Sequence, residues 1–326
     1  METQILVLNS GSSSLKFQLI EMPGETTVCE GLAERIGSER ARLKVRTASG
    51  AFEEALGEAD HREALERIAA LLRDPEAGGL QGESSLAAVG HRVVHGGDRF
   101  SRTTVIDAEV REQIRELSRL APLHNPHNLE GILLSEALFP GALQVAVFDT
   151  AFHQTIPLKA RKYAIPEALF SEHGIQVYGF HGTSHKYVYE QVARQMGAGG
   201  RIVSLHLGNG CSATAIRDGK SVDHSLGFTP TGGLIMGTRS GDIDHGIIFY
   251  LVETLGYSLE AVNELLMSES GLLGLTGYTD FRDIQKGAAE GDARCELAIE
   301  MVAYRIRKYI GAYAAVMNGL DGLIFT

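Results

Sequence analysis

The segment from Ile5 to Ile20 reads ILVLNSGSSSLKFQLI, which places a run of small polar residues between two apolar runs. The apolar runs, Ile5–Leu8 and Leu15–Ile20, predict two β-strands joined by a polar turn. Backbone N–H groups beside Gly11 can converge on phosphate oxygens, because no side chain blocks their approach. The turn therefore predicts either a phosphate cradle or an ordinary solvated hairpin, for which the same residue types are expected.

Two side chains beside this turn carry further chemistry. Lys16 adds a positive charge that can meet a phosphate, and the amide oxygen of Asn9 is a ligand type that hydrated Mg²⁺ accepts. The segment lacks the G-x-x-x-x-G-K-[ST] spacing of a Walker loop. A nucleotide site here would therefore belong to a different class.

A similar strand–turn–strand pattern returns in the second half of the chain, where Leu205–Ser212 reads LHLGNGCS. Two such hairpins predict a duplicated unit with a cleft between the copies, unless a common motif occurs twice by chance. His206 lies inside an apolar strand, where a hairpin that needs Asn-Gly only for its geometry does not require a histidine. This histidine favours a ligand-binding role for the second turn.

The composition limits the class of protein. A length of 326 residues corresponds to about two domains, and the alternation of predicted strands and helices indicates an α/β protein with domains over residues 1–150 and 151–326. The net charge of −11 argues against binding to nucleic acid or to anionic lipid. Three widely spaced cysteines predict a reducing compartment and no disulfide framework, and the sequence shows neither a secretory signal nor an apolar run long enough to span a membrane.

Hydrophobic periodicity predicts several elements directly. Residues 51–73 and 293–318 have helical spacing, whereas Gln144–Phe148 and Ile175–Tyr178 are short apolar runs typical of strands. Asp149 follows the first of these strands at its carboxyl end, where α/β folds place ligand groups. Its alternative role is that of a helix cap or turn residue.

Two arginines lie where an unpaired charge is costly. Arg92 lies in the apolar stretch Ala87–Val94, and Arg239 lies in a glycine-rich loop. A guanidinium fork matches carboxylate or phosphate oxygens two at a time. Each arginine could instead form a structural ion pair, with Asp242 or Asp244 as the neighbours of Arg239. Together, one in each half of the chain, the two arginines predict a clamp on an anionic group.

Two further motifs contain groups suited to a polyanionic ligand. His181 and His185 have the spacing of zinc ligands on a helix, but the intervening Gly-Thr-Ser predicts a loop that leads into a helix cap, which disfavours zinc. We interpret His181 as a donor to a developing negative charge. Thr279–Arg282 is predicted to lie in a loop, where its aspartate could accept ribose hydroxyls while its phenylalanine or arginine stacks on a purine.

In this order, the motifs resemble those of the acetate kinase family, within the superfamily of acetate and sugar kinases, heat-shock proteins and actin. The resemblance covers the chain from Ile5 to its end. It implies two duplicated actin-like, ribonuclease H-like domains with a cleft between them, the second incomplete. The motifs that carry it are LVLNSGSSSLK (6–16), HRVVHGG (91–97), FDTAFH (148–153), YGFHGTSH (178–185), HLGNG (206–210), TPTGG (229–233), GTRSGD (237–242) and TDFR (279–282).

The resemblance implies a reversible, Mg²⁺-dependent transfer of a phosphoryl group between ATP and acetate, by a cytoplasmic homodimer. It implies that Asn9 binds Mg²⁺, that Lys16 binds the nucleotide phosphates, and that Arg92 binds the substrate. Asp149 would be the catalytic carboxylate; we interpret it as an orienting or metal-shell group, because a carboxylate substrate is already ionised at neutral pH. The remaining implied roles are transition-state stabilisation by His181 and Arg239, ATP contacts by His206, Leu207, Gly208, Asn209, Gly210, Asp280, Phe281 and Arg282, and a methyl pocket formed by Val94, Leu123, Phe180 and Pro230.

Other functions remain open on the sequence. The chain ends at Thr326 after a predicted strand, whereas the family continues with a glycine-rich adenosine loop, a Mg²⁺-binding glutamate and a terminal helix. A chain truncated there is expected to have weak or no kinase activity. One alternative is a propionate kinase, which Val94 disfavours by leaving little room beyond a methyl group. The other is a non-catalytic ATP-binding module, which would not need Arg92, His181 and Arg239 together.

Overall fold

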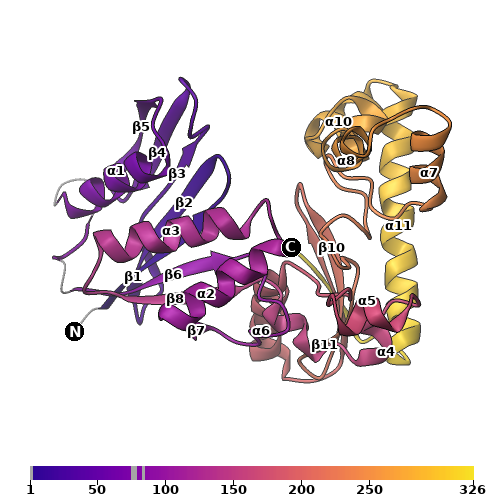
Figure 1. Ribbon diagram of the computed structural model, residues 1–326, viewed down its shortest axis with the longest axis horizontal. Coiled ribbons are helices and arrows are strands. Elements are labelled where there is room, and N and C mark those ends of the chain that lie inside the picture. Colours follow the sequence, from indigo (N-terminus) through magenta and orange to yellow (C-terminus); the bar gives the residue numbers. More distant parts are fainter. Residues whose placement is uncertain (1–2, 75–78, 83–84) are drawn as a thin grey trace. The chain divides into compact units, whose positions relative to one another are not determined.

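The computed structural model of the protein describes residues 3–74, 79–82 and 85–326. The chain divides into two compact units, Met1–Ala151 and Phe152–Thr326, each of which is described by itself (Figure 1). Among the described residues, no helix combines the length and the apolar character that a membrane span requires.

The first unit is built on an eight-stranded sheet with the strand order β5-β4-β3-β2-β1-β6-β8-β7. Strands β1 to β5 form an antiparallel meander, whereas β6 and β8 extend the sheet in parallel from β1. The even-numbered side chains of β1 are buried, as expected of a sheet with one covered face. The strands are β1 (Thr3–Ser10), β2 (Ser14–Met22), β3 (Thr26–Glu34), β4 (Ala41–Thr47), β5 (Gly50–Gly57), β6 (Leu86–Val93), β7 (Thr104–Val105) and β8 (Leu143–Phe148).

Helices cover this face of the first sheet. α1 (His61–Arg73) and α3 (Asn125–Leu138) pack beside each other, and α2 (Ala108–Glu116) packs against α3 (Figure 1). The apolar side of α1 forms one buried cluster with β1 to β4, which includes Leu65 of the helix and Phe17 of the sheet. The same cluster includes residues of β1 and β6, whose ends carry Asn9 and Arg92, whereas Ala146 and Phe148 of β8 pack in a second cluster.

The second unit contains a four-stranded sheet with the order β11-β10-β9-β12. Buried side chains of β9 alternate between two clusters, so that Val203 packs with α11 and Ile202 packs with α6. Both faces of the sheet are therefore covered. The elements of this unit are β9 (Arg201–Leu207), β10 (Cys211–Arg217), β11 (Lys220–His224), β12 (Gly322–Phe325), α4 (Leu158–Arg161), α5 (Glu167–Ser171), α6 (Gly182–Met196), α7 (Gly246–Glu253), α8 (Leu259–Ser268), α9 (Gly271–Thr276), α10 (Phe281–Ala289) and α11 (Ala293–Met317).

The two units share one strand arrangement. In the first, β1 pairs with β2 in an antiparallel hairpin and with β6 in parallel. In the second, β9 pairs with β10 in an antiparallel hairpin and with β12 in parallel. The predicted α/β class and the two predicted hairpins are confirmed, and the repeated pairing is the one expected of duplicated actin-like domains.

The prediction of one helix over residues 51–73 is wrong in its first part, because residues 50–57 form β5. The helix begins only at His61, where Asp60 caps it: Asp60 accepts from the Glu63 backbone N–H at 2.9 Å, and the Asp60 N–H donates to the Glu63 carboxylate at 3.0 Å. This reciprocal capping box sets the start of the helix more strongly than the apolar spacing upstream of it.

Two predictions in the second unit are also corrected. Residues 175–178 do not form a strand; their regular pairing is one isolated bridge between Lys162 and Gln176. Asp280 is the N-cap of α10, so that Phe281 and Arg282 lie in the first turn of a helix rather than in a loop. The contact that begins α10 lies within the motif itself, because the Asp280 carboxylate accepts from the Arg282 N–H at 2.9 Å.

Candidate active site

Asn9, Arg92 and Asp149 lie at the carboxyl ends of β1, β6 and β8, which are neighbours in the first sheet. Arg92 Nε donates to both carboxylate oxygens of Asp149 at 3.0 and 3.1 Å, and Nη2 donates to Oδ2 at 2.6 Å. Arg92 Nη1 donates to the amide oxygen of Asn9 at 3.4 Å. Three residues that were predicted separately thus form one cluster.

The two ends of this ion pair differ in exposure. The Asp149 side chain is 3% exposed, whereas that of Arg92 is 40% exposed. Attraction by Asp149 raises the pKa of Arg92, so the guanidinium remains charged. The arrangement presents a fixed cation at the surface with its counter-charge buried behind it, which suits the binding of a small anion.

Two buried asparagines that the sequence analysis missed hold the backbone around this cluster. Asn128 accepts from the Val94 N–H at 3.0 Å and donates to the Ser10 carbonyl at 2.7 Å. Asn125 accepts from the His95 N–H at 3.1 Å and donates to its carbonyl at 2.9 Å. The signal was available, since both asparagines occur in the first turn of α3, a position where a polar side chain is free to bond a neighbouring loop.

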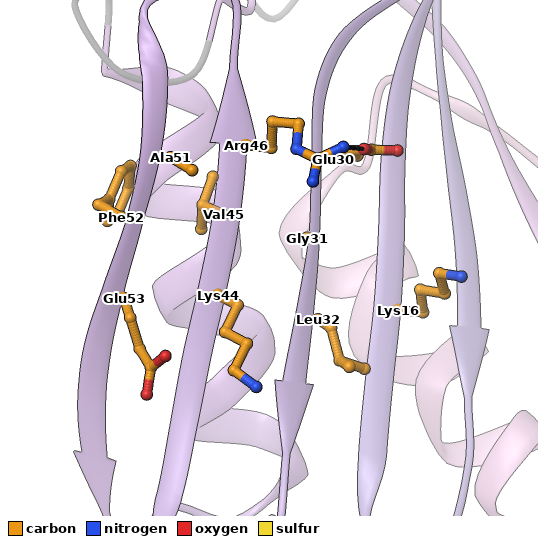
Figure 2. A pocket seen from close by; sticks show the side chains of 10 residues that line it. All are labelled: Lys16, Glu30, Gly31, Leu32, Lys44, Val45, Arg46, Ala51, Phe52 and Glu53. Carbon is orange, nitrogen blue, oxygen red and sulfur yellow. Dashed lines mark hydrogen bonds and ion pairs between the residues drawn. The ribbon is translucent and has the colours of Figure 1, made fainter. Parts of the chain in front are cut away.

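The first polar turn closes on itself, because the Gly11 N–H donates to the Ser14 carbonyl at 2.8 Å. Lys16 lies beyond the turn on β2 and lines a pocket of about 560 Å³ over β2 to β5 (Figure 2). Figure 2 also shows Arg46 and Glu30 of this pocket joined by an ion pair, whose length is 3.4 Å. The predicted contact of Lys16 with nucleotide phosphates stays a prediction.

In the second unit, His181 and Arg239 converge beside Gly210. A Cβ atom at Gly210 would lie 3.5 Å from His181 Cε1 and 4.0 Å from Arg239 Nη1, so a glycine keeps this space open. His181 is the N-cap of α6, with a left-handed φ of 57°, and its ring lies 4.6 Å from that of His206. The structure therefore brings together four predicted residues within this unit, His181, His206, Gly210 and Arg239.

Arg239 does not form the ion pair with Asp242 or Asp244 that its neighbours in sequence allow. Its Nη1 donates to the Pro230 carbonyl at 3.0 Å, and among the described residues no carboxylate lies within ion-pairing distance of it. Asp242 instead accepts from the Gly233 N–H at 2.6 Å. Burial lowers the pKa of Arg239, as expected of a cation that lacks a counter-charge.

A second pocket, of about 620 Å³, lies between the turn after β9 and the helices α10 and α11. Leu207, Gly208 and Asn209 line it from the turn, and Asp280 and Phe281 line it from the start of α10. Its remaining walls include the apolar side chains Ile235, Leu272, Ile299, Val302 and Ile306. The structure thus joins two predicted ATP-contacting motifs that are about 70 residues apart. Arg282 folds back onto Asp280, with Nη2 2.5 Å from the carboxylate.

The four residues predicted to form a methyl pocket are divided between the units. Val94 and Leu123 belong to the first unit, where Val94 is buried and Leu123 is 61% exposed. Phe180 and Pro230 belong to the second, where Phe180 is buried and Pro230 is half-buried. A shared pocket for these residues remains a prediction.

The amino-acid sequence is similar to one family model and to relatives that bear the same name. A model of the acetokinase family matches residues 4–326. An acetate kinase from Flavobacterium johnsoniae is 56% identical, with 99% of this chain and 82% of the relative covered. An acetate kinase from Thermotoga maritima is 50% identical, with 99% of this chain and 81% of the relative covered.

Solved structures of an acetate kinase and of a propionate kinase have folds similar to that of this chain. The crystal structure of Porphyromonas gingivalis acetate kinase has a TM-score of 0.94 and 44% identity, with 98% of this chain and 82% of the other covered. The crystal structure of a propionate kinase from Francisella tularensis also has a TM-score of 0.94, with 43% identity and the same coverage.

Proposed function

The chain belongs to the acetokinase family, and on that premise we propose that it transfers the γ-phosphoryl group of ATP to acetate, giving acetyl phosphate and ADP reversibly. Kinases of this family use ATP and ADP and have a carboxyl group as acceptor. The observation that carries the proposal is the family match over residues 4–326. The geometry of the candidate site supports the roles proposed below for Arg92, Asp149, His181 and Arg239.

Arg92 is the proposed site for the acetate carboxylate. Acetate is ionised at neutral pH, so its oxygen can attack phosphorus without a general base. The partly exposed guanidinium of Arg92 can orient that oxygen, because Asp149 holds the guanidinium through two of its nitrogens. Since both oxygens of Asp149 are bonded to Arg92, we assign Asp149 to orientation rather than to proton transfer.

His181 and Arg239 are the proposed donors to the transferred group. A phosphoryl group in transfer spreads its charge over three equatorial oxygens, so the protein must supply positioned donors and cations. The absence of a carboxylate partner for Arg239 among the described residues leaves its charge available for such an anion. The convergence of both side chains over Gly210 supports a common target.

The pocket of about 620 Å³ is the proposed adenosine site. Its size and its largely apolar walls, which carry a few polar groups, are typical of a pocket for a small aromatic ligand. The turn His206–Gly210 would meet the phosphates, and Asp280 to Arg282 would contact the nucleoside. Lys16 is the further proposed contact to phosphate.

Mg²⁺ is the proposed metal cofactor. Mg²⁺ in kinases usually keeps several waters and is held by one or two oxygen ligands together with the nucleotide phosphates. The amide oxygen of Asn9, at the carboxyl edge of β1, is the proposed protein ligand, and the buried Asp149, whose oxygens both bind Arg92, would add negative charge behind the site. Bound there, the ion would offset the negative charge of the phosphates.

Acetate is the proposed acceptor, with propionate as the second candidate. Val94, Leu123, Phe180 and Pro230 are the proposed methyl pocket, in which we expect the bulk of Val94 to leave little space beyond a methyl group. The second candidate is favoured by the structural similarity to a propionate kinase. One methylene changes the free energy of binding by ~1–3 kcal/mol, so comparing kcat/KM for acetate, propionate and butyrate distinguishes the two.

We also propose that the protein is a cytoplasmic homodimer. Phe249, Tyr250 and Leu259 of α7 and α8 are each more than half exposed, and exposed apolar groups of this size are typical of protein interfaces. Light scattering after size exclusion should give twice the mass of one chain. The double variant Phe249→Glu, Leu259→Glu should give the mass of one chain.

Trapping acetyl phosphate with hydroxylamine tests the proposed function. With ATP, Mg²⁺ and acetate the purified protein should form acetyl hydroxamate, and omission of any one component should abolish it. This result would overturn the expectation of weak or no kinase activity for a chain that ends at Thr326. ATP binding without hydroxamate formation would contradict the proposal and would indicate a non-catalytic ATP-binding module.

A further inference from the structure

Four side chains of the second unit form one chain of hydrogen bonds that ends on His181. Ser204 Oγ bonds His185 Nδ1 at 2.9 Å, His185 Nε2 bonds Ser212 Oγ at 2.8 Å, and Ser212 Oγ bonds His181 Nδ1 at 2.9 Å. Ser204, His185 and Ser212 are fully buried, and they come from β9, α6 and β10. This chain of residues is called the serine–histidine relay below.

The number of N–H and O–H groups in the serine–histidine relay determines which atom donates in each of its hydrogen bonds. Burial, followed by the neighbouring histidines, lowers the pKa of His185 well below its ordinary range, so its ring is neutral and carries one N–H. Ser204 has one O–H to donate, and within the described part of the chain the acceptor bonded to its Oγ is His185 Nδ1. If Ser204 accepted from His185 instead, its own O–H would lie buried without an acceptor, which is unfavourable.

Ser204 therefore donates to His185 Nδ1, and the proton of His185 lies on Nε2. The Nε2–H donates to Ser212, whose single O–H then donates to Nδ1 of His181. Because Nδ1 of His181 accepts this bond, the neutral His181 ring carries its proton on Nε2. This nitrogen lies on the side of Gly210, 3.6 Å from the position that a Cβ atom there would take, near Arg239.

We propose that Ser212 is a positioning residue for His181, which holds the His181 proton on Nε2 so that Nε2–H donates to the transferred phosphoryl group. The role of the phosphoryl group in this inference rests on the proposed function, whereas the assignment of the proton rests on the hydrogen bonds and on the burial of a neutral His185. Control of a histidine tautomer by a buried neighbour is a recognised requirement for efficient catalysis.

Ser212→Ala tests the proposal, with Ser221→Ala as the matched control. Ser221 is also fully buried and bonds a buried histidine, since its Oγ lies 2.8 Å from His153 Nδ1, but it is not part of the relay. Ser212→Ala should lower kcat about 10- to 100-fold while KM for ATP and acetate changes less than about threefold. Ser221→Ala should keep kcat within about threefold, and Ser212→Thr should recover most of the loss. A Ser212→Ala kcat equal to that of Ser221→Ala would overturn the proposal.

Nitrogen NMR gives a readout that is independent of kinase activity. The ¹⁵N shifts of the His181 ring, assigned by comparison with His181→Gln, report which nitrogen carries the proton. The wild type should show a bare Nδ1 and a protonated Nε2, and Ser212→Ala should show a mixture of both tautomers. A protonated Nδ1 in the neutral wild-type ring would overturn the assignment. The expected tautomer in a protein that forms no acetyl phosphate would support the assignment and contradict the proposed function.

Discussion

Asp149 binds Arg92 through both of its carboxylate oxygens, and the shortest of these contacts, from Nη2 to Oδ2, is 2.6 Å. The carboxylate is buried while the guanidinium reaches solvent. A cation held in this way loses little conformational entropy when an anion binds to it, because its orientation is already set. The structural ion pair and the binding of an anion are therefore compatible roles for Arg92, because the ion pair with Asp149 holds the guanidinium in the orientation that an anionic ligand would meet.

Asp149→Asn should lower kcat by at least about 100-fold, because Arg92 loses the charge that orients it. The unfolding free energy should fall by about 1–2 kcal/mol, which is less than the ~3–5 kcal/mol of a fully buried pair because Arg92 is 40% exposed. Urea unfolding and the hydroxamate assay measure the two effects. Normal turnover in a folded Asp149→Asn variant would exclude the orienting role.

Arg239→Ala should lower kcat by about 10²- to 10³-fold, with a folded protein and a small change in stability. Arg294→Ala is the control, since Arg294 is 69% exposed and pairs with Asp292 at the surface, and it should keep wild-type kcat. Arg239→Lys should remain far below the wild type, because an ammonium group lacks the planar fork. If Arg239→Ala and Arg294→Ala turned over at the same rate, Arg239 would have no catalytic role.

Gly237→Ala should weaken nucleotide binding by at least about tenfold. A Cβ atom there would lie 1.8 Å from the amide oxygen of Asn209, so the Asn209 side chain and the turn that lines the larger pocket must move. Gly311→Ala, in α11, is the control, because nothing lies within 4 Å of its added Cβ and alanine favours the helix. Calorimetric titration with ADP compares the two variants, and equal affinities would argue against this turn as the nucleotide site.

The stability of the protein should fall as the pH is lowered below about 6.5. Burial lowers the pKa of His91 to about 4, so the unfolded chain binds more protons than the folded one between these values. Stability from this group is present above about pH 6.5 and is lost as the pH falls toward 4, which amounts to about 2 kcal/mol between pH 7.5 and pH 5. His224 and His185, whose pKa values burial also lowers, act in the same direction.

Urea unfolding of wild type and His91→Gln at the two pH values isolates the contribution of His91. The glutamine variant does not titrate, so its loss of stability between pH 7.5 and pH 5 should be smaller by about 2 kcal/mol. The same loss in both proteins would show that His91 is not buried in its neutral form.

Local sequence patterns predicted the parts of the fold that depend on residues close together in the sequence. The apolar runs on both sides of Gly11 and of Asn209 predicted the two hairpins, and the long periodic segment 293–318 predicted α11. The helix predicted over 51–73 failed in its first part because β5 is stabilised by its pairing with β4, a contact that local periodicity does not report. The same limit applies to residues 175–178, which were predicted to form a strand but have one isolated bridge, between Lys162 and Gln176.

Residue order alone identified the chemistry of this protein, since the glycine turns, the isolated arginines and the histidine motif each carry functional groups that a phosphoryl group needs. Only folding joined Arg92 to Asp149 across 57 residues, left Arg239 without a carboxylate among the described residues, and placed Ser212 between two histidines. The physical reason is that a residue type determines what a group can donate, accept or repel, whereas strand pairing and helix packing determine which partner it meets. The partner then sets the charge, the orientation and the proton position on which reactivity depends.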